Sequence, residues 1–233
     1  ISYLASRIWV GGGCLHTVLR SGMMPHAVDY AYRFASADRL YLNVTNRCTN
    51  RCVFCVRNSQ PGLGDGRLWG GPEPGMEDLM HAVDGRGGAE AFSEIVWCGF
   101  GEPTFRLDLI VEASSVFRAA GARVRLDTNG HGDLIHDRDV LPELEASIDD
   151  VFVSLNAPTC ARYIELCRPG SGDLPREVAP ERYWLTMLDF LRRAAGRFGR
   201  VQASVVGHML DGEEIDACRD LAASLGCDEL RVR

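Results

Sequence analysis

Lysine is absent from this chain of 233 residues, and arginine supplies all 25 of its basic residues. Chemistry that needs a lysine amine is therefore excluded for this chain, including Schiff bases, pyridoxal phosphate anchors and P-loop lysines. The chain also lacks any run of 18 apolar residues, the length that a membrane-spanning helix requires. We therefore expect no membrane partner.

Positive charge is scarce overall but concentrated near the start of the chain. The net charge is -7, yet the first 60 residues carry seven arginines against only Asp29 and Asp38. The acidic excess disfavours duplex nucleic acid as a ligand. A small anionic ligand near the basic N-terminal third is compatible with the sequence, because local charge sets the potential in a cleft.

The nine cysteines do not form the pattern of a secreted disulfide scaffold. Their number is odd, their spacing is irregular, and three of them crowd into residues 48–55. The apolar run Ile8–Val10 before Cys14 is too short for a signal-peptide core. These features favour reduced thiols in a cytoplasmic protein.

Short apolar runs alternate with longer amphipathic patterns from residue 39 onward, which predicts βαβ units and a parallel sheet in one α/β domain. We expect residues 1–38 to form an N-terminal extension and 39–233 the core domain. The glycine-rich segment 61–75 is expected to be a loop that closes over a cavity. Strands are predicted at 40–45, 94–98, 123–127, 150–155, 201–206 and 229–232, and helices at 76–85, 107–120, 140–147, 180–197 and 213–225.

Three cysteines follow the first predicted strand, with three residues between Cys48 and Cys52 and two between Cys52 and Cys55. Thiolates at this spacing can converge on one face of a tight loop and bind a soft metal or an iron-sulfur cluster. Structural zinc is an alternative, although it needs a fourth ligand that no nearby residue supplies at a familiar spacing. A cluster held by three cysteines leaves one iron open to an exogenous ligand.

The segment TNRCTNRCVFCVRN resembles the signature of the radical S-adenosylmethionine (radical SAM) superfamily, whose hallmark is this cysteine spacing. Members favour an aromatic residue before the third cysteine, which Phe54 matches, so the resemblance places Phe54 among the cofactor-binding residues. The later segment CGFGEPT resembles the family's Gly-Gly-Glu segment, with Phe100 in place of the first glycine. That segment binds the methionyl ammonium of SAM in the family, so the resemblance assigns Gly101 and Glu102 to cofactor binding.

The resemblance extends to residues that follow the later strands. It assigns Asn129, Ser154 and Asn156 to the ribose and methionyl carboxylate of SAM, although ordinary turn chemistry also explains these polar residues. Arg168 could pair with the same carboxylate, and Gly207 matches the position that contacts adenine. The strings DTNGHG, VSLNAPT, LCRPG and LRVR further resemble the TatD-associated radical SAM proteins.

This resemblance implies a partial (β/α)6 barrel that holds one [4Fe-4S] cluster through Cys48, Cys52 and Cys55, with SAM bound at the open iron. It further implies reductive cleavage of SAM to a 5'-deoxyadenosyl radical. The electrons would come from a donor such as flavodoxin or ferredoxin, and the substrate, a small molecule or a protein, is left open. No catalytic residue is assigned. A glycyl-radical-enzyme activating protein and a non-catalytic zinc-binding module are the alternatives.

The remaining histidines and cysteines are expected to be ordinary structural residues. His131 and His208 follow strand ends, where a surface loop is the simplest environment. Cys98, Cys218 and Cys227 fall in apolar patterns and are expected in the core. Cys160 and Cys167 lie closest together among the other cysteines, and the sequence leaves open whether they approach a second cluster.

Overall fold

The computed structural model describes residues 28–35, 38–174 and 177–233. Its centre is a seven-stranded sheet in the order β1-β2-β5-β6-β7-β8-β9, and every neighbouring pair is parallel except β1 with β2. This confirms the predicted α/β class, with a mostly parallel sheet that is consistent with a partial barrel. The strands are β1 (Ala31–Tyr32), β2 (Arg39–Leu42), β5 (Glu94–Trp97), β6 (Arg123–Thr128), β7 (Asp150–Ser154), β8 (Arg200–Val205) and β9 (Glu229–Val232).

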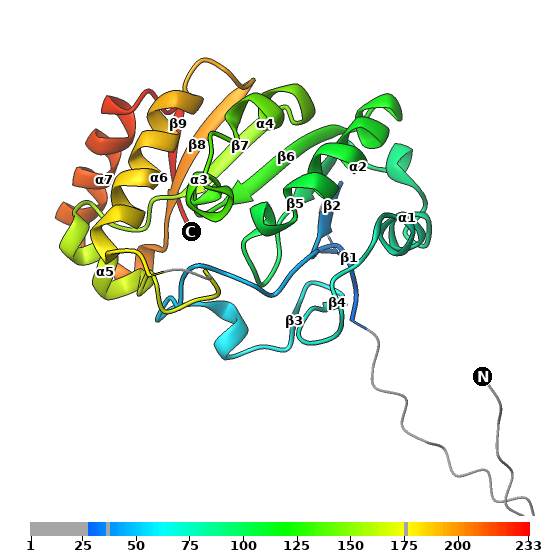
Figure 1. Cartoon of the computed structure of the whole chain (residues 1–233), viewed down its shortest axis with the longest axis horizontal. Helices are drawn as coiled ribbons and strands as arrows, with labels where there is room; N and C mark the ends of the chain where they lie inside the picture. The colour runs from blue at the N-terminus through cyan, green and yellow to red at the C-terminus, as the bar shows by residue number, and fades with distance from the viewer. Residues whose placement is uncertain (1–27, 36–37, 175–176) are drawn as a thin grey trace, which may run out of the picture.

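Helices connect the parallel strands and pack against the sheet, with α2 on β6 and both α6 and α7 on β8 (Figure 1). The α-helices are α1 (Met76–Asp84), α2 (Leu107–Ala119), α3 (Gly132–His136), α4 (Leu141–Ser147), α5 (Cys160–Cys167), α6 (Pro180–Ala194) and α7 (Gly212–Ser224). Short 3-10 helices lie at η1 (Val56–Asn58), η2 (Ala89–Ala91), η3 (Pro103–Arg106) and η4 (Gly207–Met209).

Local sequence explains where several helices begin. The Asp211 side chain accepts a hydrogen bond from the Glu214 amide, and the Glu214 side chain accepts one from the Asp211 amide, which forms a capping box at α7. Thr159 caps α5 by accepting from the Arg162 amide, and α6 begins at Pro180, a residue suited to a first helical turn.

The two faces of the sheet differ in chemistry, because strand residues alternate between them. On the helix-covered face, side chains such as Trp97, Leu126 and Val153 are completely buried. The other face carries charged or polar side chains, including Arg125, Asp127 and Gln202. The apolar face builds the core, while the polar face is available for ligands.

The predicted strands and long helices are present with shifts of a few residues, but five strands and α-helices of the described chain were missed. β1 falls within the predicted N-terminal extension and adds an antiparallel edge to the sheet. The loop predicted at 61–75 contains a two-stranded hairpin, β3 (Gly62–Leu63) with β4 (Gly66–Arg67). Helices α3 and α5 are also additional. The three strands and α3 are too short to give a clear periodic signal. Helix α5, at eight residues, is longer than the predicted α4 and was simply not recognised.

No helix among the described residues is long and apolar enough to cross a membrane. Cys14 and the rest of residues 1–27 lie outside the described part of the chain.

Candidate functional site

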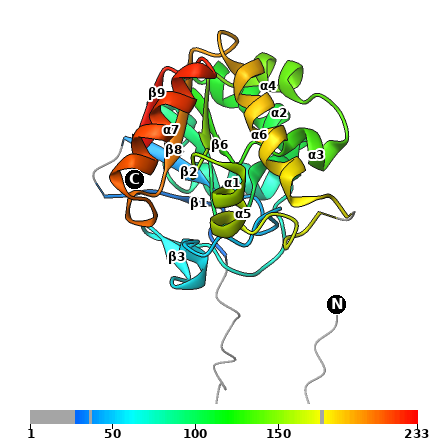
Figure 2. The ribbon, with the colours of Figure 1, turned by 90° about the vertical axis from the view of Figure 1, so that its left-hand side faces the viewer.

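The loop that carries Cys48, Cys52 and Cys55 leaves β2 and is fastened to the end of α5. The amides of Arg51 and Val53 donate to the carbonyl oxygens of Cys167 and Leu166, at 3.1 and 2.9 Å. The Asp173 carboxylate accepts from the Cys48 amide at 2.8 Å. Figures 1 and 2 both show α5 and this loop at the same end of the molecule. The local turn is thus held by residues more than 100 positions away.

Arg57 connects the cysteine loop to the glycine turn after β5. Its guanidinium donates to the carbonyl oxygens of Asn46 and Asn50, both at 3.2 Å, and of Phe100 at 3.3 Å. Backbone contact tightens the same junction, because the Glu102 amide donates to the Arg47 carbonyl at 2.8 Å. A Cβ atom on Gly101 would lie only 2.5 Å from the Thr45 and Arg47 carbonyl oxygens, so this approach requires glycine.

The three thiols are partly buried, and their surroundings favour the neutral form while no metal is bound. Burial raises the pKa of Cys48 to about 12 and also raises that of Cys55. A hydrogen bond with the Cys167 side chain, followed by burial, raises the pKa of Cys52. The Arg57 guanidinium opposes the rise at all three thiols. Metal loading would therefore release protons, because only thiolates are ligands.

A pocket of about 350 Å³ adjoins these cysteines and extends across the carboxyl ends of β5, β6 and β7. This volume lies in the usual range for a small-molecule site. Six of the eight residues predicted to bind cofactor line the pocket together with all three cysteines. These six are Phe54, Gly101, Glu102, Asn129, Ser154 and Asn156.

The other two predicted cofactor residues do not line this pocket. Arg168 is exposed at the end of α5 with a φ of 46°. Gly207 begins η4, where its amide donates to the Arg233 carbonyl at 2.8 Å, and it is Val206 before it that lines the pocket. Their roles stay predictions from the resemblance.

The Glu102 carboxylate organises the pocket wall. It is 2% exposed and accepts hydrogen bonds from both the amide and hydroxyl of Thr104, from the Thr128 hydroxyl and from the Asn129 amide, at 3.2, 2.7, 2.6 and 2.7 Å. Burial raises its pKa, and the hydrogen bonds oppose the rise. The carboxylate therefore ties the glycine turn to the end of β6.

Glu102→Ala is expected to weaken SAM binding by one to two decades while the iron content is retained. Removing the carboxylate releases Thr128 and Asn129 from their positions, and a charge-assisted hydrogen bond contributes about 1.5 to 3 kcal/mol. The dissociation constant of SAM and the iron content measure the two effects separately. Glu112→Ala on the exposed side of α2 is the control. An unchanged SAM affinity at full iron content would contradict this role.

Two buried acceptor atoms at the pocket have no partner among the described residues. They are the side-chain oxygens of Asn50 and Asn156, whose side chains are 3% and 4% exposed. Buried polar atoms are normally hydrogen-bonded, so these oxygens suit a ligand that brings its own N–H or O–H groups. Asn156 adopts a φ of 61°, which asparagine tolerates better than most residues. SAM carries an ammonium group and two ribose hydroxyls, which can donate to these two free oxygens.

The glycine-rich segment 61–75 lies beside a different pocket from the one predicted. Trp69, Gly70 and Gly71 line a cavity of about 300 Å³ on the Arg47 and Arg51 side of the cysteine loop. No described residue of the segment lines the pocket that holds the cysteines. In this structure the segment does not line the cofactor cavity, and its closure over that cavity stays a prediction.

His131 is completely buried, which contradicts the expected surface loop. Its Nδ1 lies 2.7 Å from the Thr49 hydroxyl, and its Nε2 lies 3.1 Å from the Tyr163 hydroxyl. Burial lowers the pKa of His131 to about 3. The neutral imidazole therefore connects the end of β6 to the cysteine loop, through Thr49, and to α5, through Tyr163.

The remaining cysteines divide in a way that the sequence did not reveal. Cys218 is buried, as expected, whereas Cys98 lines the pocket. Cys167 is buried beside Cys52, while Cys160 lies at the opposite end of α5. Within the described residues, no three His, Cys, Asp or Glu side chains form a group suited to a single metal ion.

Sequence reasoning missed several lining residues. Asn50 lies between Cys48 and Cys52, Asp127 precedes the polar residues at the end of β6, and Arg233 follows β9. Strand-end position was a usable signal for Asp127. The parallel pairing of β8 with β9 places Arg233, and the sequence alone does not determine that register.

The fold and site define an α/β domain with three thiols and a small-molecule pocket at the carboxyl ends of parallel strands. The family model for the radical SAM superfamily matches residues 42–224, so the chain belongs to this superfamily of enzymes. Members of the family generally use a [4Fe-4S] cluster and SAM.

Solved structures support the fold. SuiB of Streptococcus suis bound to the precursor peptide SuiA has a TM-score of 0.61 and 15% identity, and SuiB alone has 0.59 and 16%. Each match covers 84% of this chain but 39% of SuiB, so the chain spans well under half of SuiB's length. No curated protein matches the chain.

Proposed function

We propose that this chain is the core of a radical SAM enzyme, with Cys48, Cys52 and Cys55 as the ligands of a [4Fe-4S] cluster and SAM in the adjoining pocket. The single observation that carries the proposal is that one pocket of about 350 Å³ brings together all three cysteines and six of the predicted cofactor residues. A bound cluster and SAM would supply a 5'-deoxyadenosyl radical for hydrogen abstraction.

The chain's own residues would bind and orient this cofactor pair. Glu102 holds the Asn129 backbone in place, and Gly101 lets the glycine turn approach the cysteine loop. Asn156 presents its unpaired side-chain oxygen to a ligand donor. Arg57 places a positive charge beside the thiolates, which moderates the negative charge of a loaded cluster.

The finer assignments are also proposals. Residues 39–233 would form the radical SAM core, and the strings quoted above favour the TatD-associated proteins. The substrate would be a small molecule or a protein, and a cytoplasmic flavodoxin or ferredoxin would donate the electrons. A glycyl-radical activating protein and a zinc-binding module are the alternatives.

Anaerobic reconstitution with iron and sulfide tests the proposal. The loaded protein is expected to be brown, to hold close to four irons and to release 5'-deoxyadenosine from SAM after reduction, because three thiolates leave one iron open. Metal analysis and chromatography measure these results. Protein that takes up only zinc, or that holds iron without cleaving SAM, would refute the proposal. If the protein does cleave SAM, deuterium transfer from a labelled metabolite pool into 5'-deoxyadenosine would identify the substrate.

A further inference from the structure

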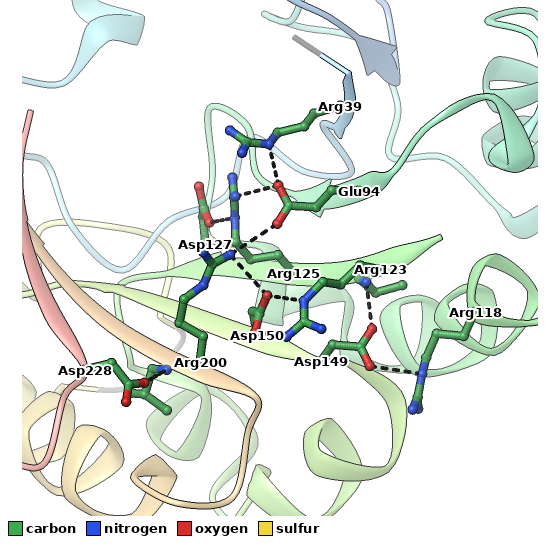
Figure 3. A network of polar contacts seen from close by, with 12 residues as sticks. Arg39, Glu94, Arg118, Arg123, Arg125, Asp127, Asp149, Asp150, Arg200 and Asp228 are labelled. Atoms are coloured by element: carbon green, nitrogen blue, oxygen red, sulfur yellow. Dashed lines mark hydrogen bonds and ion pairs between the residues drawn. The ribbon is translucent and has the colours of Figure 1, made fainter. Parts of the chain in front are cut away.

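The polar face of the sheet carries a network of ion pairs between arginines and carboxylates (Figure 3). Arg125 is 3% exposed and donates to Glu94 and Asp127 at 2.7 and 2.8 Å. Asp150 accepts from Arg123 at 2.6 Å and from Arg200 at 3.2 Å. The charges of Glu94, Asp127 and Asp150 are thus compensated within the protein, so this layer leaves no surplus carboxylate for a ligand.

A smaller pocket lies between this network and the pocket of the cysteines. It shares Asp127, Ser154 and Arg233 with the larger pocket, so the two adjoin. The sheet register places Ser154, Ser204 and Arg231 side by side on neighbouring strands. Phe152 and Gln202 complete the lining. The smaller pocket has a volume of only about 20 Å³, which is room for a single polar group. A ligand whose end enters it would therefore lie mainly in the larger pocket, next to the proposed SAM site.

Gln202 carries an unfilled acceptor in this pocket. Its side chain is 4% exposed, its Nε2 donates to the Glu229 carboxylate at 2.6 Å, and its Oε1 has no hydrogen-bond partner among the described residues. Exchanging the amide oxygen and nitrogen would set an oxygen against that carboxylate, so the hydrogen bond fixes the orientation. A buried free acceptor can accept from a ligand that brings an N–H or O–H group.

Two guanidinium groups at the same pocket have no carboxylate partner in the described chain. The exposed Arg231 guanidinium lines the pocket without a hydrogen bond or ion pair to any described residue, and the exposed Arg233 guanidinium donates only to the Ser154 hydroxyl, at 3.2 Å. By contrast, the arginines of the ion-pair network described above, Arg123, Arg125 and Arg200, are all paired with carboxylates. The local charge beside the SAM pocket is therefore positive, although the whole chain is acidic.

We propose that the substrate of the enzyme is a polar molecule that carries an oxyanion, either a carboxylate or a phosphate, and a nearby hydrogen-bond donor. Its polar end is recognised at the mouth of this smaller pocket, and the rest of the molecule lies in the larger one. This inference rests on the radical SAM function proposed above. The oxyanion binds the Arg231 and Arg233 guanidiniums, whose planar forks suit carboxylate and phosphate oxygens. The donor group binds Gln202 Oε1.

Calorimetric titration with three small probes tests the two halves of this site. Inorganic phosphate, acetate and glycolate are titrated into anaerobic, cluster-loaded protein with SAM bound, and in parallel into iron-free protein. Glycolate is expected to bind more tightly than acetate, because its hydroxyl can donate to Gln202. The ratio of phosphate to acetate affinity distinguishes the two kinds of oxyanion.

Two variants separate the contributions, and a third serves as a control. Arg231→Gln is expected to weaken all three probes roughly tenfold or more, through loss of a charge-assisted contact. Gln202→Leu is expected to leave acetate affinity unchanged and to abolish the advantage of glycolate. Arg219→Gln changes an exposed arginine of α7 that pairs with Asp216 away from the pocket, and it should change nothing. Thermal unfolding verifies that each variant is folded.

Iron content and SAM affinity are measured on the same samples, so that the two proposals fail separately. Wild-type protein that holds iron and SAM but binds no probe overturns the substrate class. Equal probe affinity in wild type and Arg231→Gln overturns it as well. Wild-type protein that holds no cluster refutes the proposed function, and the titration of iron-free protein then decides whether the anion site exists on its own.

Discussion

Replacing Cys48, Cys52 and Cys55 together by alanine is expected to abolish the charge-transfer absorbance and the iron content of the reconstituted protein. The triple change is more decisive than a single one, because the Cys167 thiol hydrogen-bonds Cys52 and could stand in for it as a ligand. No other described cysteine has such a contact with the cysteine loop. Absorbance at visible wavelengths and iron analysis after anaerobic reconstitution provide the measurement.

Cys160→Ala provides the matched control for this experiment, because Cys160 lies at the start of α5, one helix length from Cys167. It should retain full absorbance. If the triple variant kept substantial iron, and lost it only on further replacement of Cys160 and Cys167, a second cluster would exist and the single-cluster arrangement would be wrong.

His131 is expected to make the protein sensitive to acid well above the pH at which carboxylates are protonated. Burial lowers the pKa of His131 to about 3, whereas an unfolded histidine titrates near 6.5. Below pH 6.5 the unfolded chain therefore binds a proton that the folded chain refuses, so stability falls as the pH falls. The loss is about 1.4 kcal/mol per pH unit, or roughly 4 to 5 kcal/mol by pH 3.

Denaturant unfolding between pH 7.5 and 4 measures this effect. His131→Asn is expected to be less stable at neutral pH, because it loses contacts with Thr49 and Tyr163, but to lose less stability as the pH falls. His81→Asn on the exposed side of α1 is the control and should keep the wild-type slope. Parallel pH profiles for wild type and His131→Asn would show that His131 does not carry the effect.

The glycine turn and the β6 end show why part of the site was predictable. Asn129 directly follows β6, and Glu102 lies in the turn after β5. The carboxyl ends of neighbouring parallel strands meet at one edge of a sheet. Their shared pocket therefore follows from the order of the strands. Arg168 follows α5 instead, and the orientation of a short helix is set by packing, which the sequence does not show.

Cysteine spacing, strand alternation and the absence of lysine were determined by the sequence itself, because each depends only on residues close together in the chain or on composition. Those local patterns sufficed for the α/β class and for the prediction that the three cysteines hold a cluster. Only the tertiary structure decided that His131 is buried, since Thr49 lies 82 positions and Tyr163 32 positions away from it. It also decided that Arg231 stands unpaired beside Gln202, because strand register and the partners of each charge are set by long-range packing.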